Sequence, residues 1–402
     1  MLSACIAPAY AGDRTVREAI GVNIHFTDPQ PGEMDMLAGA GFGWVRMDLA
    51  WGATEREKGV YDFRHYDTLL SNVEAKHMRA LLILDYGSDI YGPGGKPPFD
   101  DEGRAAFARW AVAAVDHFKN RRVLWELWNE PNGDWFWPKH DAVDYAKLDI
   151  TVDKAIRARF PRERLIGPAT SGIDMPFLEA CFKAGCLDYW DAVSAHPYRQ
   201  TQPEDAAPEY AKLRELIARY APSGKSIPII SGEWGYSCGW DGFNDERQSR
   251  YIVREMLTNI ENGLPLSIWY DWHDDGSDPK NAEHNFGTVR VDYHPGRTPI
   301  YDPKPAYTAL KTMTSVLGDF AFDTKLTAGD PAIDHALSFV RKKDRRYALW
   351  TTSAVPHAVV VPLPTGPYTV IDWEGRRRTA IADKSGLSIT LSDRPVYVER
   401  GK

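Results

Sequence analysis

The chain has 402 residues, with 48 basic and 56 acidic side chains and a formal net charge of −8 at pH 7. This acidic balance argues against a nucleic-acid-binding protein, which usually presents a basic surface. No uninterrupted apolar run approaches the roughly 18 residues of a membrane-spanning helix, so a transmembrane segment is excluded. The length suits two or three domains, or one barrel of about 250 residues with an appendage.

The first eleven residues are small and apolar, which favours export to the periplasm or the cell exterior. Ala9-Tyr10-Ala11 has the small-x-small form of a signal-peptidase site, and Leu2-Ser3-Ala4-Cys5 resembles a lipoprotein box in which Cys5 would carry a lipid anchor. Both patterns lack a basic stretch and a full apolar run, so either needs a start further upstream. The alternative for residues 1–18 is a flexible tail of a cytoplasmic protein.

From residue 19 to about 312, short β-like runs alternate with longer amphipathic segments, which is typical of a parallel α/β fold. The expected strands are Ala19–His25, Trp44–Leu49, Ala80–Tyr86, Val123–Asn129, Arg164–Ala169, Ala192–His196, Ile227–Gly232 and Leu266–Asp271. The expected helices are Asp62–Lys76, Glu102–Asn120, Ala142–Arg159, Pro208–Tyr220 and Asn244–Asn262. Eight such units predict a (β/α)₈ TIM barrel. A doubly wound sheet would instead need a glycine-rich loop after its first strand, and Gly21-Val22-Asn23-Ile24-His25 is not one.

The sequence pattern of residues 313–402 predicts a second domain. Short alternating strands are separated by turns rich in Gly, Pro and Asp, which predicts an antiparallel β-sandwich. The expected strands are Tyr347–Thr352, Ala358–Pro362, Tyr368–Asp372, Ser388–Leu391 and Val396–Glu399.

Cysteine spacing points to no metal or redox motif. Cys181 and Cys186 are close enough in sequence to form a disulfide, and unpaired buried thiols fit equally well.

Two glutamates close apolar strands. Glu130 follows the fourth expected strand and Glu233 follows the seventh. Glutamate is a poor strand former, so these positions need another reason. The carboxyl ends of barrel strands form the active-site face, and two carboxyl groups facing each other there suit glycoside hydrolysis. A salt-bridged structural acid is the alternative for either residue alone.

The order of the motifs resembles a known family. Asn129-Glu130-Pro131 with Glu233 is similar to the retaining (β/α)₈ glycoside hydrolases of clan A. Further segments resemble glycoside hydrolase family 39 and its Psl-type exopolysaccharide-hydrolase relatives, namely Arg46–Trp51, Glu55, Gly59, Tyr61-Asp62-Phe63, Asp191–Tyr198, Lys304–Tyr307 and Arg394–Val398. The resemblance covers residues 19–400.

The resemblance implies a role for each matching residue. Glu130 would be the acid/base and Glu233 the nucleophile, and Asn129 would bind the sugar 2-hydroxyl. Arg46 and Tyr198 would flank Glu233, with His196 supporting that network and Trp269 forming the floor of the sugar subsite.

Other aromatic and polar residues at strand ends are weaker candidates for substrate contacts, with structural packing as the alternative. They are His25, Trp51, Trp135, Trp137, Trp234, Asp271 and His273. Some histidines also fall at strand ends, but no His-x-His or His-x-x-x-His pattern supports a metal site, so we expect neither a metal nor another cofactor.

The sequence therefore predicts a retaining glycosidase whose partner is a β-linked polysaccharide or oligosaccharide, with endo action on a bacterial exopolysaccharide favoured. A β-xylosidase or xylanase is the next hypothesis. A polysaccharide-binding protein without catalysis is the alternative from another class.

Overall fold

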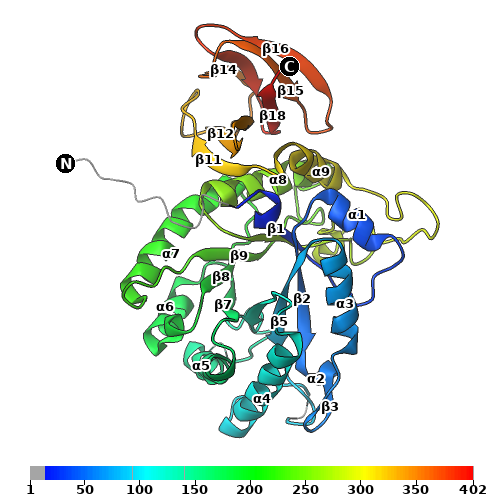
Figure 1. Ribbon diagram of the computed structural model, residues 1–402, viewed down its shortest axis with the longest axis vertical. Helices are drawn as coiled ribbons and strands as arrows, with labels where there is room; N and C mark the ends of the chain where they lie inside the picture. The colour runs from blue at the N-terminus through cyan, green and yellow to red at the C-terminus, as the bar shows by residue number, and fades with distance from the viewer. Residues whose placement is uncertain (1–13, 93, 140, 402) are drawn as a thin grey trace.

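The computed structural model describes residues 14–92, 94–139 and 141–401. Within these ranges eight parallel strands close into a barrel, in the spatial order β1-β10-β9-β8-β7-β6-β5-β2 (Figure 1). The strands are β1 (Ile20–Asn23), β2 (Trp44–Ala50), β5 (Arg79–Asp85), β6 (Leu124–Leu127), β7 (Arg164–Ser171), β8 (Ala192–His196), β9 (Ile229–Trp234) and β10 (Ser267–Trp269). The predicted TIM barrel is confirmed.

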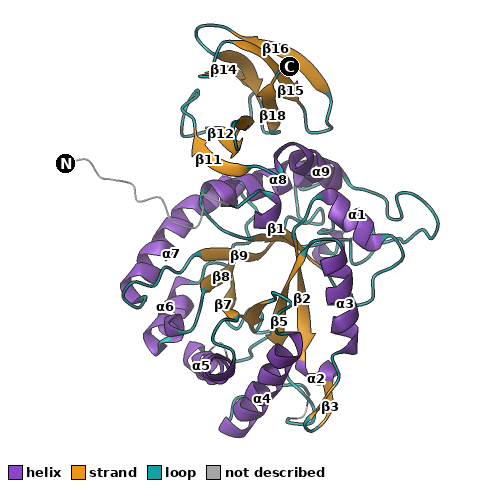
Figure 2. Cartoon of the chain, viewed as in Figure 1, coloured by secondary structure: helices purple, strands orange, loops and turns teal. Residues whose placement is uncertain are grey.

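Helices surround the barrel as an outer ring (Figure 2). They are α1 (Glu33–Ala40), α3 (Arg64–Ala75), α4 (Asp101–Phe118), α5 (Ala142–Arg159), α6 (Met175–Ala184), α7 (Ala207–Tyr220), α8 (Asp245–Glu261) and α9 (Pro305–Leu317). Short elements are η1 (Arg17–Ala19), α2 (Trp51–Thr54), β3 (Glu55–Glu57), β4 (Val60–Tyr61), η2 (Cys186–Asp188), η3 (Pro203–Ala206) and η4 (Ala282–Asn285). Side-chain caps start several of the long helices: Asp100, Asp141, Asp174 and Asn244 each accept a hydrogen bond from a backbone N–H of the first turn.

The barrel interior is layered because side chains alternate along each strand. An apolar layer fills the end where the strands begin, and it contains Trp44, Leu81, Ile83, Leu124, Ile166, Ala192, Ile230, Leu266 and Ile268. Two positions further along three of these strands stand Arg46, Glu126 and Ser194, all buried. The interior therefore changes from apolar to polar toward the carboxyl ends of the strands.

A register shift in β9 determines which side chain reaches the barrel mouth. Ser231 pairs with Ser267 and Trp234 pairs with Trp269, so β9 contains one residue more than β10 over this stretch. The extra residue reverses the alternation, as in a β-bulge. Glu233 consequently faces the mouth, while Trp234 packs outward into the core.

The C-terminal strands form an antiparallel β-sandwich beside the barrel (Figure 1). They are β11 (Ala321–Lys325), β12 (Asp334–Arg341), β13 (Asp344–Thr351), β14 (His357–Val361), β15 (Gly366–Ile371), β16 (Arg377–Ala382), β17 (Leu387–Leu391) and β18 (Val396–Arg400). Trp350 of β13 donates to Glu204 Oε1 at 2.7 Å, and Arg250 of α8 pairs with Asp393 at 2.8 Å. The predicted sandwich is confirmed.

The expected export signal and the expected lipid anchor at Cys5 lie outside the described residues. In the ranges that the structure covers, none of the helices combines the length and hydropathy needed to cross a membrane. Cys181 and Cys186 are buried free thiols.

Candidate active site

A cavity of about 690 Å³ opens at the carboxyl ends of the barrel strands. Its lining residues are Asn23, His25, Arg46, Asp48, Tyr86, Asn129, Glu130, Trp135, Phe136, Ser171, Tyr198, Glu233, Trp240, Tyr270, Glu283 and Phe286. All of them belong to the barrel and its loops. The volume falls within the usual range for ligand-binding pockets.

Arg46 is the centre of the hydrogen-bond network below this cavity. Its guanidinium donates to Glu126 Oε2 at 2.7 Å, to Glu233 Oε2 at 2.6 Å and to Asn129 Oδ1 at 2.9 Å. A further bond runs to Asn23 Oδ1 at 3.2 Å. Burial opposes the charge of Arg46, but the two glutamates outweigh burial and raise its pKa further. Its N–H groups are thus committed to neighbours in the site.

Two donors orient the carboxylate of Glu233. Tyr198 donates its hydroxyl to Oε1 at 2.8 Å, and Arg46 occupies Oε2. Because each oxygen has its own donor, the carboxylate is fixed in the plane that these two bonds define. The Glu233 side chain retains 12% exposure, toward the cavity.

Glu130 stands on an unusual stretch of backbone just after β6. Trp128 and Glu130 have φ angles of 65° and 44°, a left-handed conformation that costs a non-glycine residue about 1 kcal/mol or more. The amide of Glu130 donates to Ala169 O at 3.0 Å, which holds the turn against β7. Such strain is typical of residues that must be aimed into a site.

The protonation of Glu130 is set by its surroundings. Burial raises the pKa of this carboxyl, while a hydrogen bond with Ser171 and the charge of Arg46 partly oppose the rise. His196 Nδ1 lies 2.9 Å from Glu130 Oε1. Burial and Arg46 lower the pKa of His196 to about 4, although Glu233 opposes this. Neutral His196 accepts from Arg46 at Nε2, at 3.4 Å, so its proton is on Nδ1 and points to Glu130.

The two carboxyl groups lie close together. One oxygen of Glu130, one of Glu233 and a ring nitrogen of His196 all lie within 4.8 Å of one another. A proton donor and an ion-paired carboxylate thus flank the same small space at the base of the cavity.

A second acidic pair lies on the neighbouring strands. Burial raises the pKa of both Asp48 of β2 and Asp85 of β5, and the charge of Asp48 raises the pKa of Asp85 further. Because two buried carboxylates repel each other, this arrangement favours the neutral form of one of the two groups. Glu283 adds another acid to the wall, and burial followed by the charge of Glu233 raises its pKa. The mouth is therefore rich in carboxyl groups.

Several aromatic residues expected to contact substrate do not line the cavity. Trp269 is fully buried and donates to Phe286 O at 3.3 Å, because Ile268 faces the barrel interior and its neighbour must face outward. Trp234 is buried in the same way by the register shift, with Arg199 over its ring. Tyr270, the residue after Trp269, lines the cavity instead.

Two further tryptophans also differ from expectation, and a third agrees with it. Trp51 is buried, stacks on Tyr91 with ring centroids 4.7 Å apart and bonds to Glu55. Trp137 is buried and packs edge-on against Trp128. Burial against neighbouring loops accounts for both, whereas Trp135 is 93% exposed at the rim of the cavity.

The polar residues after β10 also lie behind the cavity wall. Asp271 is buried 3.8 Å from His25 Nδ1, and His273 lies 3.9 Å from Asp275. His25, which follows β1, lines the cavity, whereas Asp271 and His273 do not. His25 pairs with Asp275 at 3.2 Å, and this carboxylate outweighs burial and raises the pKa of His25.

Sequence reasoning missed several cavity residues. Asp48 of the cavity wall, and Glu126 of the network below the cavity, could have been found from strand alternation, since each stands two positions from a residue of the barrel interior. Tyr86, Trp240 and Phe286 come from loops and Glu283 comes from η4, and no local pattern marks them as cavity residues.

Two residue groups have the spacing of metal ligands, but their hydrogen bonds do not suit a metal. His25, Asp271 and Asp275 form one group. Asn23 uses its oxygen for Arg46 and therefore turns its amide N–H toward His25 Nε2, at 3.0 Å. The proton of His25 is then on Nδ1, the atom that would have to bind the metal. The other group is Glu130, His196 and Glu233, in which Nδ1 of His196 is likewise protonated.

The closed (β/α)₈ barrel with two glutamates at its mouth, together with the match to a family model, identifies the class as a clan A glycoside hydrolase. The family model "Cellulase (glycosyl hydrolase family 5)" matches residues 14–276, so the chain belongs to this glycoside hydrolase family. It also resembles family 39 enzymes. A solved family 39 glycoside hydrolase from the gut symbiont Bacteroides cellulosilyticus WH2 is 28% identical, with a TM-score of 0.81 over 96% of this chain and 81% of that one.

Curated relatives are β-xylosidases. The Geobacillus stearothermophilus protein is 26% identical over 300 residues, which are 65% of this chain and 57% of the relative. The Caldicellulosiruptor saccharolyticus protein is 22% identical over 73% of this chain and 64% of the relative. The chain thus spans less than two thirds of these relatives. The fold is shared with a solved β-xylosidase from Caulobacter crescentus CB15, at 18% identity, a TM-score of 0.70 and coverage of 97% of both chains.

Proposed function

We propose that this protein is a retaining β-glycosidase, with Glu233 as nucleophile and Glu130 as acid/base. The observation that carries the proposal is the approach of the two carboxyl groups to within 4.8 Å. Retaining glycosidases hold these groups about 5–5.5 Å apart, whereas inverting enzymes need about 6.5–9.5 Å to admit a water molecule between carboxylate and sugar. The oxygen-to-oxygen approach supports the retaining geometry.

The proposed reaction is a double displacement at the anomeric carbon. Glu233 attacks the anomeric carbon and forms a covalent ester while the glycosidic C–O bond breaks. Glu130 gives its proton to the departing oxygen. The same residue, now a carboxylate, takes a proton from a water molecule that attacks the anomeric carbon and releases Glu233.

The surroundings of each acid support this division of roles. Glu233 is ion-paired with Arg46, as a nucleophile requires. Burial raises the pKa of Glu130, which keeps a larger fraction of it protonated than an exposed glutamate would have. The Nδ1–H of His196 occupies Oε1, which leaves Oε2 as the oxygen that carries the proton.

We infer that the substrate is an uncharged β-linked oligosaccharide or polysaccharide. Arg46 is the single Lys or Arg among the lining residues in the described part of the chain, and its N–H groups are engaged. A uronate carboxylate would instead meet Asp48 and Glu283. The exposed ring of Trp135 and the volume of the cavity favour a ligand of more than one sugar unit.

Two substrate classes deserve testing. The curated relatives are named β-xylosidases, which favours β-linked xylose units. The exposed Trp135 at the rim favours an extended chain such as an exopolysaccharide, cleaved internally.

The experiment compares wild type with Glu233→Gln and with Glu215→Gln, an exposed control on α7. Reducing-sugar release is measured on β-xylan, β-glucan, β-mannan and bacterial exopolysaccharides, and proton NMR identifies the first-formed anomer. We expect release by wild type and Glu215→Gln, a β-anomer first, and no release by Glu233→Gln. A first-formed α-anomer, or equal release by Glu233→Gln, would contradict the mechanism. Binding of a polymer without cleavage by any variant would support a binding protein instead.

A further inference from the structure

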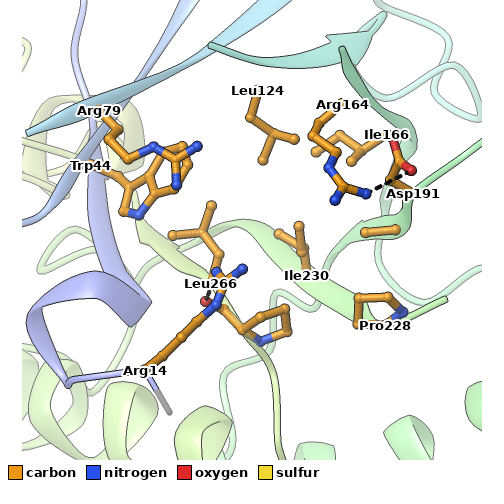
Figure 3. Close-up of a pocket in the computed structure, with 12 residues that line it drawn as sticks. Arg14, Trp44, Arg79, Leu124, Arg164, Ile166, Asp191, Pro228, Ile230 and Leu266 are labelled. Atoms are coloured by element: carbon orange, nitrogen blue, oxygen red, sulfur yellow. Dashed lines mark hydrogen bonds and ion pairs between the residues drawn. The ribbon is translucent and has the colours of Figure 1, made fainter. Parts of the chain in front are cut away.

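A second cavity lies at the opposite end of the barrel, where the strands begin. Its volume is about 280 Å³, which corresponds to roughly nine water molecules. Figure 3 shows guanidinium groups and apolar side chains around it. The lining residues are Arg14, Trp44, Arg79, Leu124, Arg164, Ile166, Asp191, Ala192, Pro228, Ile230, Pro265 and Leu266. None of them lines the catalytic cavity.

Arg79 is a cation without an acidic partner in the described residues. Its guanidinium stacks on Trp44 at 4.1 Å, and one Nη donates to Arg122 O at 3.2 Å. Its Nε is buried and has no hydrogen-bond partner among the residues that the structure covers. Burial, Arg122 and Arg14 lower the pKa of Arg79 to about 10, which shows that its positive charge is poorly compensated.

The other two arginines of the cavity, Arg14 and Arg164, differ in how far acidic groups neutralise their charge. Arg14 donates to the carbonyl of Pro265 at 3.2 Å, and within the described ranges it has no ion pair. Arg164 pairs with Asp191 at 3.1 Å, but Asp191 also pairs with Arg157 at 2.7 Å. One carboxylate thus serves two arginines, and the cavity as a whole carries excess positive charge.

The remaining wall is apolar. Leu124, Ile166, Ile230 and Leu266 belong to the apolar layer of the barrel interior, and they form the floor between the arginines (Figure 3). An apolar floor with unbalanced guanidinium groups at its rim is complementary to a small molecule with an apolar body and one anionic end.

We propose that this cavity is a binding site for a small organic carboxylate, whose carboxylate is bound by Arg79 and Arg14 and whose apolar body rests on the barrel floor. Trp44 provides the aromatic plane on which Arg79 is held in position. The site is separate from the catalytic one, so a bound carboxylate does not compete with a sugar substrate.

The test uses the full chain and phenylacetate as the probe, with 2-phenylethanol as a matched compound that lacks the carboxylate. Isothermal titration calorimetry is run on wild type, Arg79→Gln, Arg14→Gln and the control Arg162→Gln, an exposed arginine on the same end of the barrel that does not line this cavity. We expect one phenylacetate per chain and roughly ten- to hundredfold weaker binding in Arg79→Gln and Arg14→Gln. Arg162→Gln should bind as wild type does, and 2-phenylethanol should bind at least tenfold more weakly.

Circular dichroism verifies that each variant is folded. If Arg79→Gln does not fold, the affinity of Arg14→Gln for phenylacetate tests the proposal. Absence of phenylacetate binding to wild type up to about 10 mM would overturn the proposal. Equal binding by wild type and the folded arginine variants would overturn it too, as would displacement of the acid by a sugar bound in the catalytic cavity.

Discussion

His196 donates its Nδ1 proton to Glu130 across 2.9 Å, from a position with no exposed surface. The imidazole lies between Arg46, which donates to its other nitrogen, and the carboxyl of the proposed acid. A histidine held this way is a neutral donor, and its protonation would place a second positive charge beside Arg46.

The first prediction concerns stability at acidic pH. Burial and Arg46 lower the pKa of His196 from 6.5 to about 4 in the folded protein. A lowered pKa means that the unfolded chain binds the proton first, so stability is lost as the pH falls from 6.5 toward 4. At pH 5 this amounts to about 2 kcal/mol relative to pH 8.

Urea unfolding of wild type and His196→Asn at pH 8 and pH 5 measures this effect. We expect the free energy of unfolding to fall between these pH values by about 2 kcal/mol more in wild type than in the variant. The comparison cancels the carboxyl groups with raised pKa values, such as Asp85, which act in the opposite direction. The same pH dependence in both proteins would show that His196 is charged in the fold.

Glu130→Gln provides the second prediction. The variant cannot protonate a leaving group, so hydrolysis of natural glycosides should slow by roughly 10²–10⁴-fold. Aryl glycosides with acidic phenol leaving groups need little protonation and should keep most of their bond-cleavage rate. The wild-type rate should fall as the pH rises through the pKa of Glu130, which burial raises, and this alkaline limb should be absent from the variant.

Stopped-flow release of dinitrophenol, compared with turnover of a xylo-oligosaccharide, separates the two effects. Added azide should restore turnover of the aryl glycoside in Glu130→Gln and produce a β-glycosyl azide. An equal loss of rate on both substrates would assign the proton transfer to another residue.

The sequence predicted the barrel and sandwich architecture more accurately than it predicted which residues line the cavity. Acids that close apolar strands were enough to select Glu130 and Glu233, because a barrel brings all carboxyl ends of its strands together. Trp234 was misplaced because the direction in which one side chain points depends on the strand register, and the extra residue of β9 leaves no mark in the sequence. Trp269 points outward because its neighbour Ile268 faces the barrel interior. Tyr86 and Glu283 lie in segments that connect the barrel strands to later elements, and the course of these segments depends on tertiary packing.

Trp135 leads to a third prediction, which concerns long substrates. Its ring is 93% exposed and lines the cavity, so it can stack on a sugar unit beyond the cleavage point. Trp135→Ala should raise KM for a polysaccharide about fivefold, a loss of about 1 kcal/mol of stacking, and leave KM for a short aryl glycoside unchanged. The thermal midpoint should stay the same because the side chain buries little surface.

Ile381→Ala is the control, since Ile381 is an exposed apolar side chain on the sandwich, at 75%. Steady-state kinetics on polymer and aryl glycoside should show no change for it. If Trp135→Ala also leaves KM for every polymer unchanged, the ring has no role in substrate binding.

The last prediction concerns substrate charge. A uronate carboxylate bound at the base of the cavity would lie near Asp48 and Glu283, with the N–H groups of Arg46 already engaged. Like charges about 5 Å apart at an effective dielectric constant near 20 repel by about 3 kcal/mol. An aryl β-glucuronide should therefore have a kcat/KM about 100-fold below that of the matched aryl β-glucoside or β-xyloside.

Glu283→Gln removes one of the repelling charges, so it should raise the kcat/KM of the glucuronide toward that of the neutral glycosides. The kcat/KM of the neutral glycosides should stay within about twofold of the wild-type value. Comparable kcat/KM values for charged and neutral glycosides in wild type would show that the acids of the mouth do not select the substrate.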